Sequence, residues 1–252
     1  MGSVFFELMA EMDFTKHSGG LSATNELIEL CHIDTSKYIL DVGCGVGITP
    51  CYIARKFGCR IVGIDFLVSM IDRSRERARR QGVEELIDFR VADVQDLPFD
   101  DEEFDIVIGE SIMAFVQDKQ KSVDESVRVI KKGGYFGITE TAWLEDPSPK
   151  NLATLSQTFG GIFNPLTADG WEQLLLQAGL RDIVTSTHDV TVMNEAFNRL
   201  RRLGFIDFTK ALYKTLFLII TKPLFRDALR ATMSEPKELL DSWEYGIFVG
   251  RK

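Results

Sequence analysis

Three glycines alternate behind an aspartate in residues 38–50, YILDVGCGVGITP, and this spacing is the first indication of chemistry in the chain. A dinucleotide-binding loop has the pattern G-x-G-x-x-G, but here Ile48 occupies the last position and the glycine comes one residue early, at Gly47. A phosphate-binding P-loop needs a lysine after its last glycine, whereas Thr49 and Pro50 follow here. The remaining pattern, D-x-G-x-G-x-G, predicts a strand-to-helix turn whose bare backbone lies close to a ligand.

Three aspartates stand where predicted strands end. Asp41 ends the first strand, Asp65 the second and Asp93 the third. Ligands of an open parallel sheet bind outside the carboxyl ends of its strands, so these side chains should lie near one another. A carboxylate at Asp65 can accept both hydroxyls of a ribose, one at Asp93 can reach the exocyclic amine of an adenine, and Asp41 suits an ammonium group better than a pyrophosphate. The three acids predict a site for a nucleoside with a cationic appendage.

The alternation of predicted strands and helices supplies the frame for these residues. Short apolar runs that are typical of strands are separated by segments with helical periodicity, some of which end at glycine. This alternation indicates a doubly wound parallel α/β sheet, with helices on both faces because crossovers are right-handed. The predicted strands cover residues 37–42, 60–65, 86–93, 103–110 and 135–143, and the predicted helices between them cover residues 49–57, 67–82 and 118–134.

The segments outside this alternation are less regular. No internal repeat or low-complexity linker divides the chain, so residues 1–252 are predicted to form a single domain. Its first 35 residues are interpreted as cap helices, and residues 194–243 as a helical lid inserted before the last strand. In detail, we expect helices over residues 3–14 and 21–33, a proline-rich loop over 146–150, a helix over 167–180, a strand over 181–192 and a last strand over 245–252.

Composition limits the kind of partner. The net charge of −9 argues against nucleic acid, because phosphate binding needs a basic face. The four cysteines form no C-x-x-C pair and do not cluster with the three histidines, so we expect no metal site and no disulfide framework. The N-terminal residues carry acids where a signal peptide would carry bases, and no apolar run is long enough to span a membrane. A cytoplasmic protein is the expectation.

Four motifs occur in order along the chain: YILDVGCGVG (38–47), VGIDFLVSMI (62–71), VADVQDLPFDDEEFDIVIGE (91–110) and VIKKGGYFGITE (129–140). Together they resemble the class I S-adenosylmethionine-dependent methyltransferases, of the small-molecule type that includes the ubiquinone and menaquinone C-methyltransferases. Residues 17–27, HSGGLSATNEL, also resemble the helix that precedes the glycine motif in such enzymes. The resemblance implies a Rossmann-like methyltransferase fold, with a seven-stranded, mostly parallel sheet whose last strand is antiparallel, and S-adenosyl-L-methionine as cofactor.

The resemblance also assigns cofactor-binding roles to residues of this sequence. The glycine loop lines the methionine part of the cofactor, Gly19 and Gly20 close over its carboxylate, and further residues hold the amino group, the ribose and the adenine. Met70 has core packing as an alternative role. The implied contacts are Gly43, Gly45 and Gly47 with the methionine part, Asp41 with the amino group, Asp65 with the ribose, Phe66, Met70, Asp93 and Val94 with the adenine, and Glu110 and Ser111 near the sulfonium.

The methyl acceptor and the catalytic residues are less defined. No residue has the spacing of a committed general base, and Glu110 and His17 are the candidates. Residues 194–243 mix Phe, Leu and Ile with scattered Arg and Lys, which indicates either a lid that packs on the sheet or an apolar wall for a quinone- or lipid-like acceptor, with basic residues touching membrane phosphates. A cofactor-binding regulatory or assembly protein without turnover and a nicotinamide-dependent oxidoreductase are the alternative functions.

Overall fold

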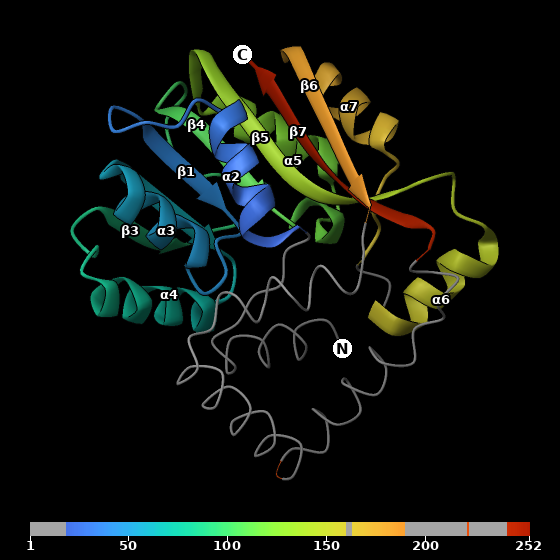
Figure 1. Cartoon of the computed structure of the whole chain (residues 1–252), viewed down its shortest axis with the longest axis horizontal. Helices are drawn as coiled ribbons and strands as arrows, with labels where there is room; N and C mark the ends of the chain where they lie inside the picture. The colour runs from blue at the N-terminus through green and yellow to red at the C-terminus, as the bar shows by residue number, and fades with distance from the viewer. Residues whose placement is uncertain (1–18, 160–162, 190–220, 222–240) are drawn as a thin grey trace.

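The computed structural model describes residues 19–159, 163–189, 221 and 241–252, which form a single sheet between layers of helices (Figure 1). The sheet has seven strands in the order β3-β2-β1-β4-β5-β7-β6. Its strands are β1 (Tyr38–Val42), β2 (Arg60–Asp65), β3 (Ile87–Val91), β4 (Phe104–Glu110), β5 (Ile130–Trp143), β6 (Arg181–Asp189) and β7 (Trp243–Arg251). The helices are α2 (Gly20–Leu30), α3 (Ile48–Phe57), α4 (Val68–Gln81), the 3₁₀ turn η1 (Met113–Phe115), α5 (Lys119–Arg128), α6 (Pro149–Phe159) and α7 (Ala168–Gln177).

The direction of the strands confirms the predicted fold class. β1 to β5 are parallel to one another, and β7 is antiparallel to both β5 and β6. The predicted last strand is therefore present as the antiparallel one, and it lies between two strands that precede it in the chain. The strand order reverses at β1, which pairs with β2 on one side and β4 on the other. This is the switch point at which open α/β sheets bind their ligands.

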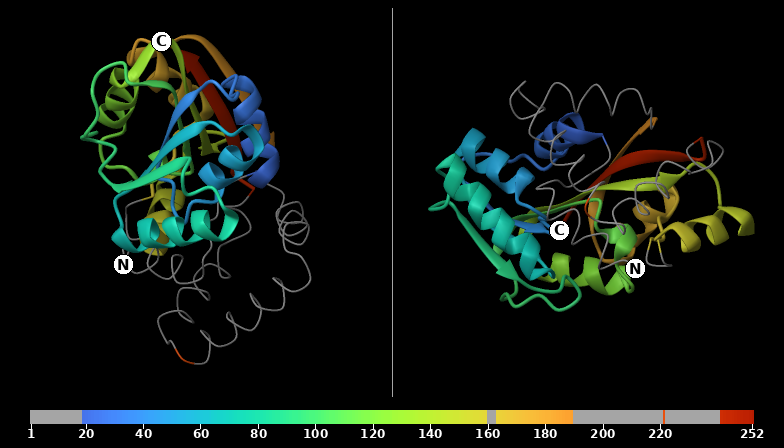
Figure 2. Two further views of the ribbon diagram at one scale, coloured as in Figure 1. Left: turned by 90° about the vertical axis from the view of Figure 1, so that its left-hand side faces the viewer. Right: turned by 90° about the horizontal axis from the view of Figure 1, so that it is seen from below.

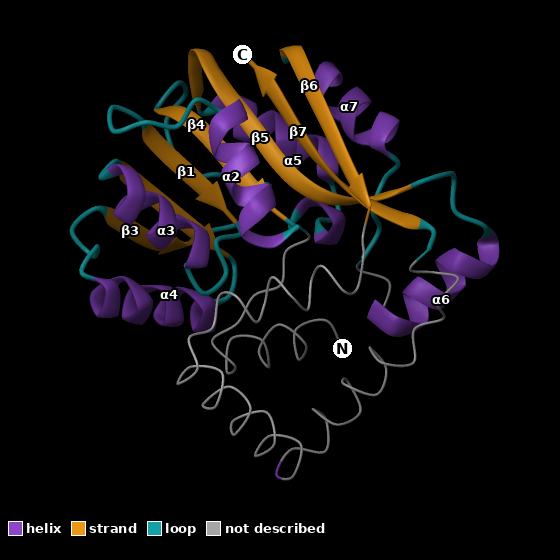
Figure 3. Ribbon diagram, viewed as in Figure 1, coloured by secondary structure: helices purple, strands orange, loops and turns teal. Residues whose placement is uncertain are grey.

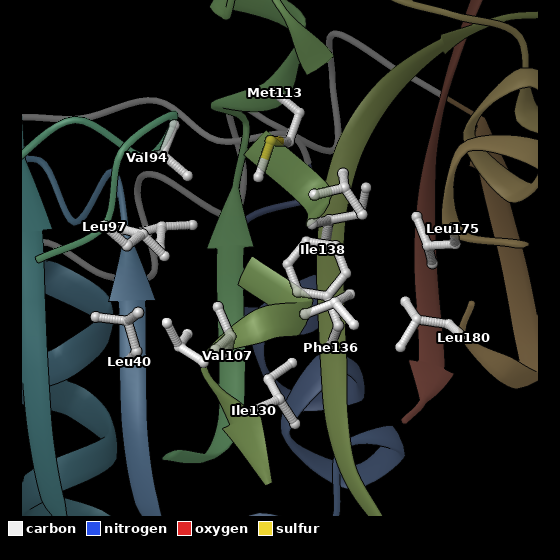
Figure 4. Close-up of a cluster of buried hydrophobic side chains, with 14 of the residues drawn as sticks. Leu40, Val94, Leu97, Val107, Met113, Ile130, Phe136, Ile138, Leu175 and Leu180 are labelled. Carbon is white, nitrogen blue, oxygen red and sulfur yellow. The ribbon is translucent and has the colours of Figure 1, made fainter. Parts of the chain in front are cut away.

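Two apolar layers hold the helices on the sheet (Figure 2). Successive strand residues point to opposite faces, so Ile39 packs with α2, α3 and α4 on one face, while Leu40 packs with α5 and α7 on the other. Figure 4 shows the second cluster, in which Leu40, Val107 and Phe136 come from neighbouring strands. All three side chains are fully buried. The same alternation decides which face of the sheet each polar strand-end residue occupies.

Two local predictions are wrong, and both errors lie after β4. The helix expected over residues 118–134 ends at Arg128, and β5 begins at Ile130 rather than at residue 135. Val129 and Ile130 are both fully buried, so the chain passes straight from helix to strand. Gly134 sits inside this strand because a Cβ there would lie 2.4 Å from the carbonyl oxygen of Asp105.

The second error is the proline-rich loop expected over residues 146–150, because Pro149 begins α6 (Figure 3). Proline is favoured in the first turn of a helix, where no amide donor is needed. The helix predicted over 3–14 and nearly all of the predicted lid over 194–243 lie outside the described residues. At its end, Trp243 belongs to β7. None of the described helices is long and apolar enough to cross a membrane.

Thr167 begins α7, and its replacement gives a first testable prediction. Its hydroxyl accepts a hydrogen bond from the Gly170 amide at 3.1 Å, and the helix that follows buries Trp171 and Leu175 completely. Because an N-cap supplies a partner for an otherwise unpaired amide, Thr167→Ala should lower the free energy of unfolding by about 1 kcal/mol. Urea denaturation measures this change. Thr167→Ser keeps the acceptor and should stay close to wild type; equal losses in both variants would contradict the capping role.

Candidate functional site

The glycine loop between β1 and α3 adopts a backbone that other residues rarely allow. Gly43, Gly45 and Gly47 have φ values of 71°, 53° and 77°, and Gly47 caps the start of α3. A Cβ at Gly43 would lie 2.3 Å from Cδ1 of Ile112. The first glycine is therefore required both by its conformation and by the close approach of the chain that follows β4. The backbone amides of this loop therefore lie next to the carboxyl end of the sheet.

Asp65 at the end of β2 is tied to this loop. Its Oδ2 accepts a hydrogen bond from the Gly45 amide at 3.1 Å, and its Oδ1 accepts one from the Leu67 amide at 3.0 Å. Burial raises the pKa of this carboxyl, an effect that the hydrogen bonds from the backbone amides oppose. The predicted ribose-binding residue thus lies directly beside the glycine loop.

Asp41 at the end of β1 is the most deeply buried of the predicted site residues that carry a charge. It is 2% exposed, and its Oδ2 has no hydrogen-bond partner among the residues that the structure describes. Burial raises the pKa of Asp41 well above its usual range, and the negative charges of Glu110 and Asp65 add to this effect. A buried carboxylate oxygen without a donor is costly, so this group is suited to a cationic partner from outside the chain.

Glu110 ends β4 on the same face of the sheet and joins two helices. Its Oε1 accepts a hydrogen bond from the Thr24 hydroxyl of α2 at 2.9 Å, and its Oε2 accepts one from the Thr49 hydroxyl of α3. These two threonines belong to the site, although the sequence analysis did not single them out. The signal in the sequence that could have found them is a threonine at a position where helical periodicity expects an apolar residue; both threonines are buried in the structure.

The chain after β4 bends sharply at the edge of the site. Ser111 has a φ of 55°, a left-handed conformation that is rare outside glycine, and its amide donates to the Thr139 carbonyl at 2.7 Å. The next three amides, of Ile112, Met113 and Ala114, donate to the carboxylate of Glu140 on β5 at 2.8, 2.6 and 3.4 Å. Glu140, like Thr24 and Thr49, was not predicted from the sequence as part of the site.

The predicted adenine-side residues lie next to the ends of β2 and β3. The Ala92 amide donates to the Asp65 carbonyl at 3.1 Å, which joins the two strand ends. Asp93 is exposed and accepts from the Gln95 amide at 2.9 Å, and Val94 is 6% exposed. Phe66 is 63% exposed, whereas Met70 is buried against Val46, in a position that serves core packing.

The remaining candidates are placed as follows. Gly19 caps α2 with a φ of 72°, and a Cβ there would lie 2.4 Å from the ring of Tyr245 on β7. Gly20 is the first residue of α2. His17 lies outside the described residues. Within the part of the chain that the structure describes, no group of histidine, cysteine, aspartate and glutamate side chains could hold a metal ion.

The site therefore combines the loop of Gly43, Gly45 and Gly47, which we call the glycine cradle, with three carboxylates on one face of the sheet. Asp41, Asp65 and Glu110 share that face because each stands at an even number of positions from a strand residue packed against α2, α3 or α4. The donors named above for Asp65 and Glu110 are backbone amides and threonine hydroxyls, and Oδ2 of Asp41 has no donor among the described residues. Such an arrangement favours a ligand that carries hydroxyl groups and positive charge, and disfavours a phosphate.

Comparison with known proteins identifies the family to which this arrangement belongs. Residues 40–138 match the family model of methyltransferase domains. The chain is 30% identical over 178 residues to an uncharacterized protein of Haemophilus influenzae, covering 70% of this chain and 71% of that protein. It is 28% identical over 242 residues to phosphoethanolamine N-methyltransferase 3 of Arabidopsis thaliana, covering 93% of this chain but 46% of that protein. The chain thus spans less than half the length of that plant enzyme.

Solved structures agree on the fold. Phosphoethanolamine N-methyltransferase 2 of Haemonchus contortus, in complex with phosphomonomethylethanolamine and S-adenosylhomocysteine, superposes with a TM-score of 0.78 at 17% identity, covering 100% of this chain and 58% of that one. A putative sarcosine dimethylglycine methyltransferase from Galdieria sulphuraria superposes with a TM-score of 0.73 at 17% identity, covering 91% of this chain and 83% of that one. These two structures show the shared fold. The match to the methyltransferase domain model and the relatives named as methyltransferases identify the chain as a class I S-adenosylmethionine-dependent methyltransferase.

Proposed function

We propose that Asp41 holds the amino group of S-adenosylmethionine and that the cradle around it binds the rest of the cofactor. The observation that carries this proposal is the buried Oδ2 of Asp41, which has no donor among the described residues. An ammonium group supplies the donors and the positive charge that this oxygen lacks. The residues present therefore fit the cofactor of the family, because the two neighbouring carboxylates also favour a cation.

The other contacts follow from the same placement. Asp65 accepts the ribose hydroxyls, and the loop of Gly43, Gly45 and Gly47 follows the methionine part, where side chains would collide with it. Asp93 and Val94 border the adenine, with Phe66 and Met70 beside it. Glu110 and Ser111 lie toward the sulfonium, and Gly19 with Gly20 toward the carboxylate. Each assignment matches a residue at this edge of the sheet with the part of the ligand that its chemistry suits.

Bound S-adenosylmethionine supplies an electrophilic methyl group, and the chain's task is to align the acceptor and to exclude water. Methyl transfer from a sulfonium is an in-line displacement, so positioning contributes much of the rate. Glu110 acts here as a positioning residue rather than a base, because both of its oxygens already accept hydrogen bonds from threonine hydroxyls. These two contacts also fasten α2 and α3 to the end of β4, which keeps the walls of the cradle together.

We propose an amine as the methyl acceptor. The support is that relatives aligned with much of this domain include N-methyltransferases named for phosphoethanolamine and for sarcosine and dimethylglycine. A carboxylate-lined site also attracts an amine, which must lose its proton to solvent before its nitrogen can attack the methyl group. The quinone- or lipid-like acceptor, with peripheral membrane contact, is a second candidate that rests on the Phe- and Leu-rich composition of residues 194–243.

The assignment of Asp41 predicts a selective loss of affinity. Asp41→Asn removes the charge but keeps the shape, so binding of S-adenosylhomocysteine should weaken roughly tenfold, which corresponds to about 1.4 kcal/mol. The affinity for 5′-methylthioadenosine, which has the nucleoside but lacks the α-amino group of the methionine part, should stay within a factor of two. Isothermal titration calorimetry measures both ligands, with NADH as a negative control.

Proton release gives an independent reading of the same contact. Because the pKa of Asp41 is raised in the free protein, an ammonium partner should favour its ionised form and release a proton on binding. Titrations of S-adenosylhomocysteine in buffers with different ionisation enthalpies detect this release, which should be absent in Asp41→Asn. Equal weakening of both ligands in the variant would contradict the role given to Asp41.

The acceptor class is tested by turnover. Purified protein with S-adenosylmethionine is incubated with phosphoethanolamine, sarcosine, dimethylglycine and a demethylated prenyl quinone, and methylated product is measured. Methylation of an amine supports the first candidate, and methylation of the quinone together with binding to anionic liposomes supports the second. Tight cofactor binding without turnover of any of these compounds would favour a binding protein over an enzyme of either class.

A further inference from the structure

We propose that Glu140 is a positioning residue for the methyltransferase site, because its carboxylate fixes the loop of residues 111–115 against the glycine cradle. Glu140 stands on β5 with the side chain fully buried on the face of the sheet that packs against α5 and α7. It lies on the opposite face from Asp41 and Glu110, so it touches neither the cradle nor the groups assigned to the cofactor. This inference rests on the proposed cofactor site.

The contacts of Glu140 are concentrated on one short stretch of backbone. Its Oε1 accepts from the Ile112 and Met113 amides at 2.8 and 2.6 Å, and its Oε2 accepts from the Ala114 amide at 3.4 Å. Three successive amides that point at one carboxylate define the path of the chain after β4. This path includes the left-handed turn at Ser111. An ionised carboxylate is the best acceptor for such a group of donors, because each bond is charge-assisted.

Ile112 connects the loop of residues 111–115 to the glycine cradle. The Ile112 side chain lies against the glycine loop so closely that a Cβ at Gly43 would be 2.3 Å from its Cδ1. On its other side the loop reaches the segment after α6: the Asn164 amide donates to the Ala114 carbonyl at 2.8 Å, and the Phe115 and Phe163 rings lie 4.8 Å apart. A shift of this loop would therefore move one wall of the cradle.

The charge of Glu140 changes in the range where the enzyme can be assayed. Burial raises the pKa of this carboxyl from 4.5 to about 7, against the effect of the three amides and of Lys119 on α5. The strands on either side place no charged side chain beside Glu140. Its partner on β7 is Gly246, and Glu110 of β4 bonds to α2 and α3 on the other face of the sheet. As the pH falls through 7, Glu140 takes up a proton and the loop loses its charge-assisted bonds.

Protonation of Glu140 is expected to have opposite effects on the stability of the folded protein and on the hydrogen bonds that hold the loop. Since the folded pKa is raised, the folded protein binds more protons than the unfolded chain between pH 4.5 and 7, and the contribution of Glu140 to stability falls as the pH rises. The loop, in contrast, is held more firmly as the pH rises, because Glu140 is then ionised. Ligand affinity that improves while this contribution to stability declines is a signature that a purely structural residue would not give.

The test compares Glu140→Gln with wild type in the full chain. Gln keeps one acceptor oxygen but places an amide donor where the other oxygen was. The ratio of the wild-type to variant affinity for S-adenosylhomocysteine, measured by calorimetry, should be about ten at pH 8 and approach one at pH 6. Glu172 is a half-buried glutamate of α7 that accepts a hydrogen bond from the Thr185 hydroxyl on the edge strand β6, away from the cradle. Glu172→Gln is the matched control and should give a ratio near one throughout.

Hydrogen exchange tests the contact without any ligand. In wild type, the protection of the amides of residues 112–114, corrected for intrinsic exchange, should fall below about pH 7, and Glu140→Gln should show the low protection at every pH. The wild-type measurement alone decides the matter if the variant does not fold. Protection that is independent of pH, or an affinity ratio that stays constant from pH 6 to 8, would overturn the proposal. Failure of wild type to bind S-adenosylhomocysteine at any pH would instead contradict the proposed cofactor site.

Discussion

Replacing Asp65 by alanine should weaken the binding of S-adenosylhomocysteine by at least roughly a hundredfold. If its carboxylate accepts both ribose hydroxyls, the variant loses two charge-assisted hydrogen bonds, worth about 1.5 kcal/mol or more each, and a hundredfold change corresponds to about 2.7 kcal/mol. The loss should exceed that of Asp41→Asn because the glycine loop also loses the acceptor for its Gly45 amide. Isothermal titration calorimetry measures the effect, and circular dichroism checks that the fold persists.

Asp88→Ala is the matched control for this experiment. Asp88 stands on the neighbouring strand β3 and pairs with Arg90 at 2.6 Å on an exposed surface, so its removal takes away a carboxylate without touching the cradle. Affinity should stay within a factor of two of wild type. An affinity of Asp65→Ala close to that of the control would mean that the ribose is held elsewhere, and Asp65 would then serve only to order the glycine loop.

Gly43→Ala should lower the free energy of unfolding by about 2–4 kcal/mol and weaken cofactor binding along with it. Two effects add: a left-handed backbone at a φ of 71° costs about 1 kcal/mol for a residue with a Cβ, and the contact with Ile112 forces overpacking worth about 1–3 kcal/mol. Chemical denaturation of wild type and variant measures the sum. Calorimetry with S-adenosylhomocysteine measures the consequence for the site.

Two further variants separate these effects. Gly58 has nearly the same φ, 70°, but a Cβ there would meet no atom within 4 Å, so Gly58→Ala should cost about 1 kcal/mol, the backbone term alone. Combining Gly43→Ala with Ile112→Ala removes the two closest atoms of that contact, Cδ1 and Cγ1 of Ile112. The double variant should therefore be more stable than the sum of the single changes predicts by at least about 1 kcal/mol. Strict additivity would show that Gly43 and Ile112 do not constrain each other.

Most of the fold could be predicted because local signals and the family resemblance agree. The apolar runs that end in Asp41, Asp65 and Glu110 are strands. Gly47 begins α3 and Gly82 ends α4, as expected. The errors occur where a tertiary contact overrides a local signal. Gly133 and Gly134 are typical of a helix end, but burial of Ile130 and the close packing of Gly134 on β4 extend the strand instead.

The site was predictable only in part, for a related reason. Residues that act through their place at a strand end, such as Asp41 and Asp65, carry a signal in the sequence. Thr24, Thr49 and Glu140 take part through contacts that are 86, 61 and about 27 residues apart along the chain, and no local pattern reports such contacts. Glu140 is the single acid of β5 and stands between Thr139 and Thr141, yet one acid in a strand does not reveal which amides it will meet.

The position of β7 between β5 and β6 has a consequence for the order in which the sheet can form. The strands β1 to β4 lie within residues 38–110 and are joined by short crossovers, whereas β6 ends at Asp189 and its partner β7 begins at Trp243. In the described sheet β6 pairs with β7 alone, so β6 stays unpaired until β7, which is more than fifty residues further along the chain, has reached it. Contacts between distant parts of a chain form slowly. The half of the sheet that carries the glycine loop and the strand-end carboxylates can therefore assemble before the chain has completed its other edge.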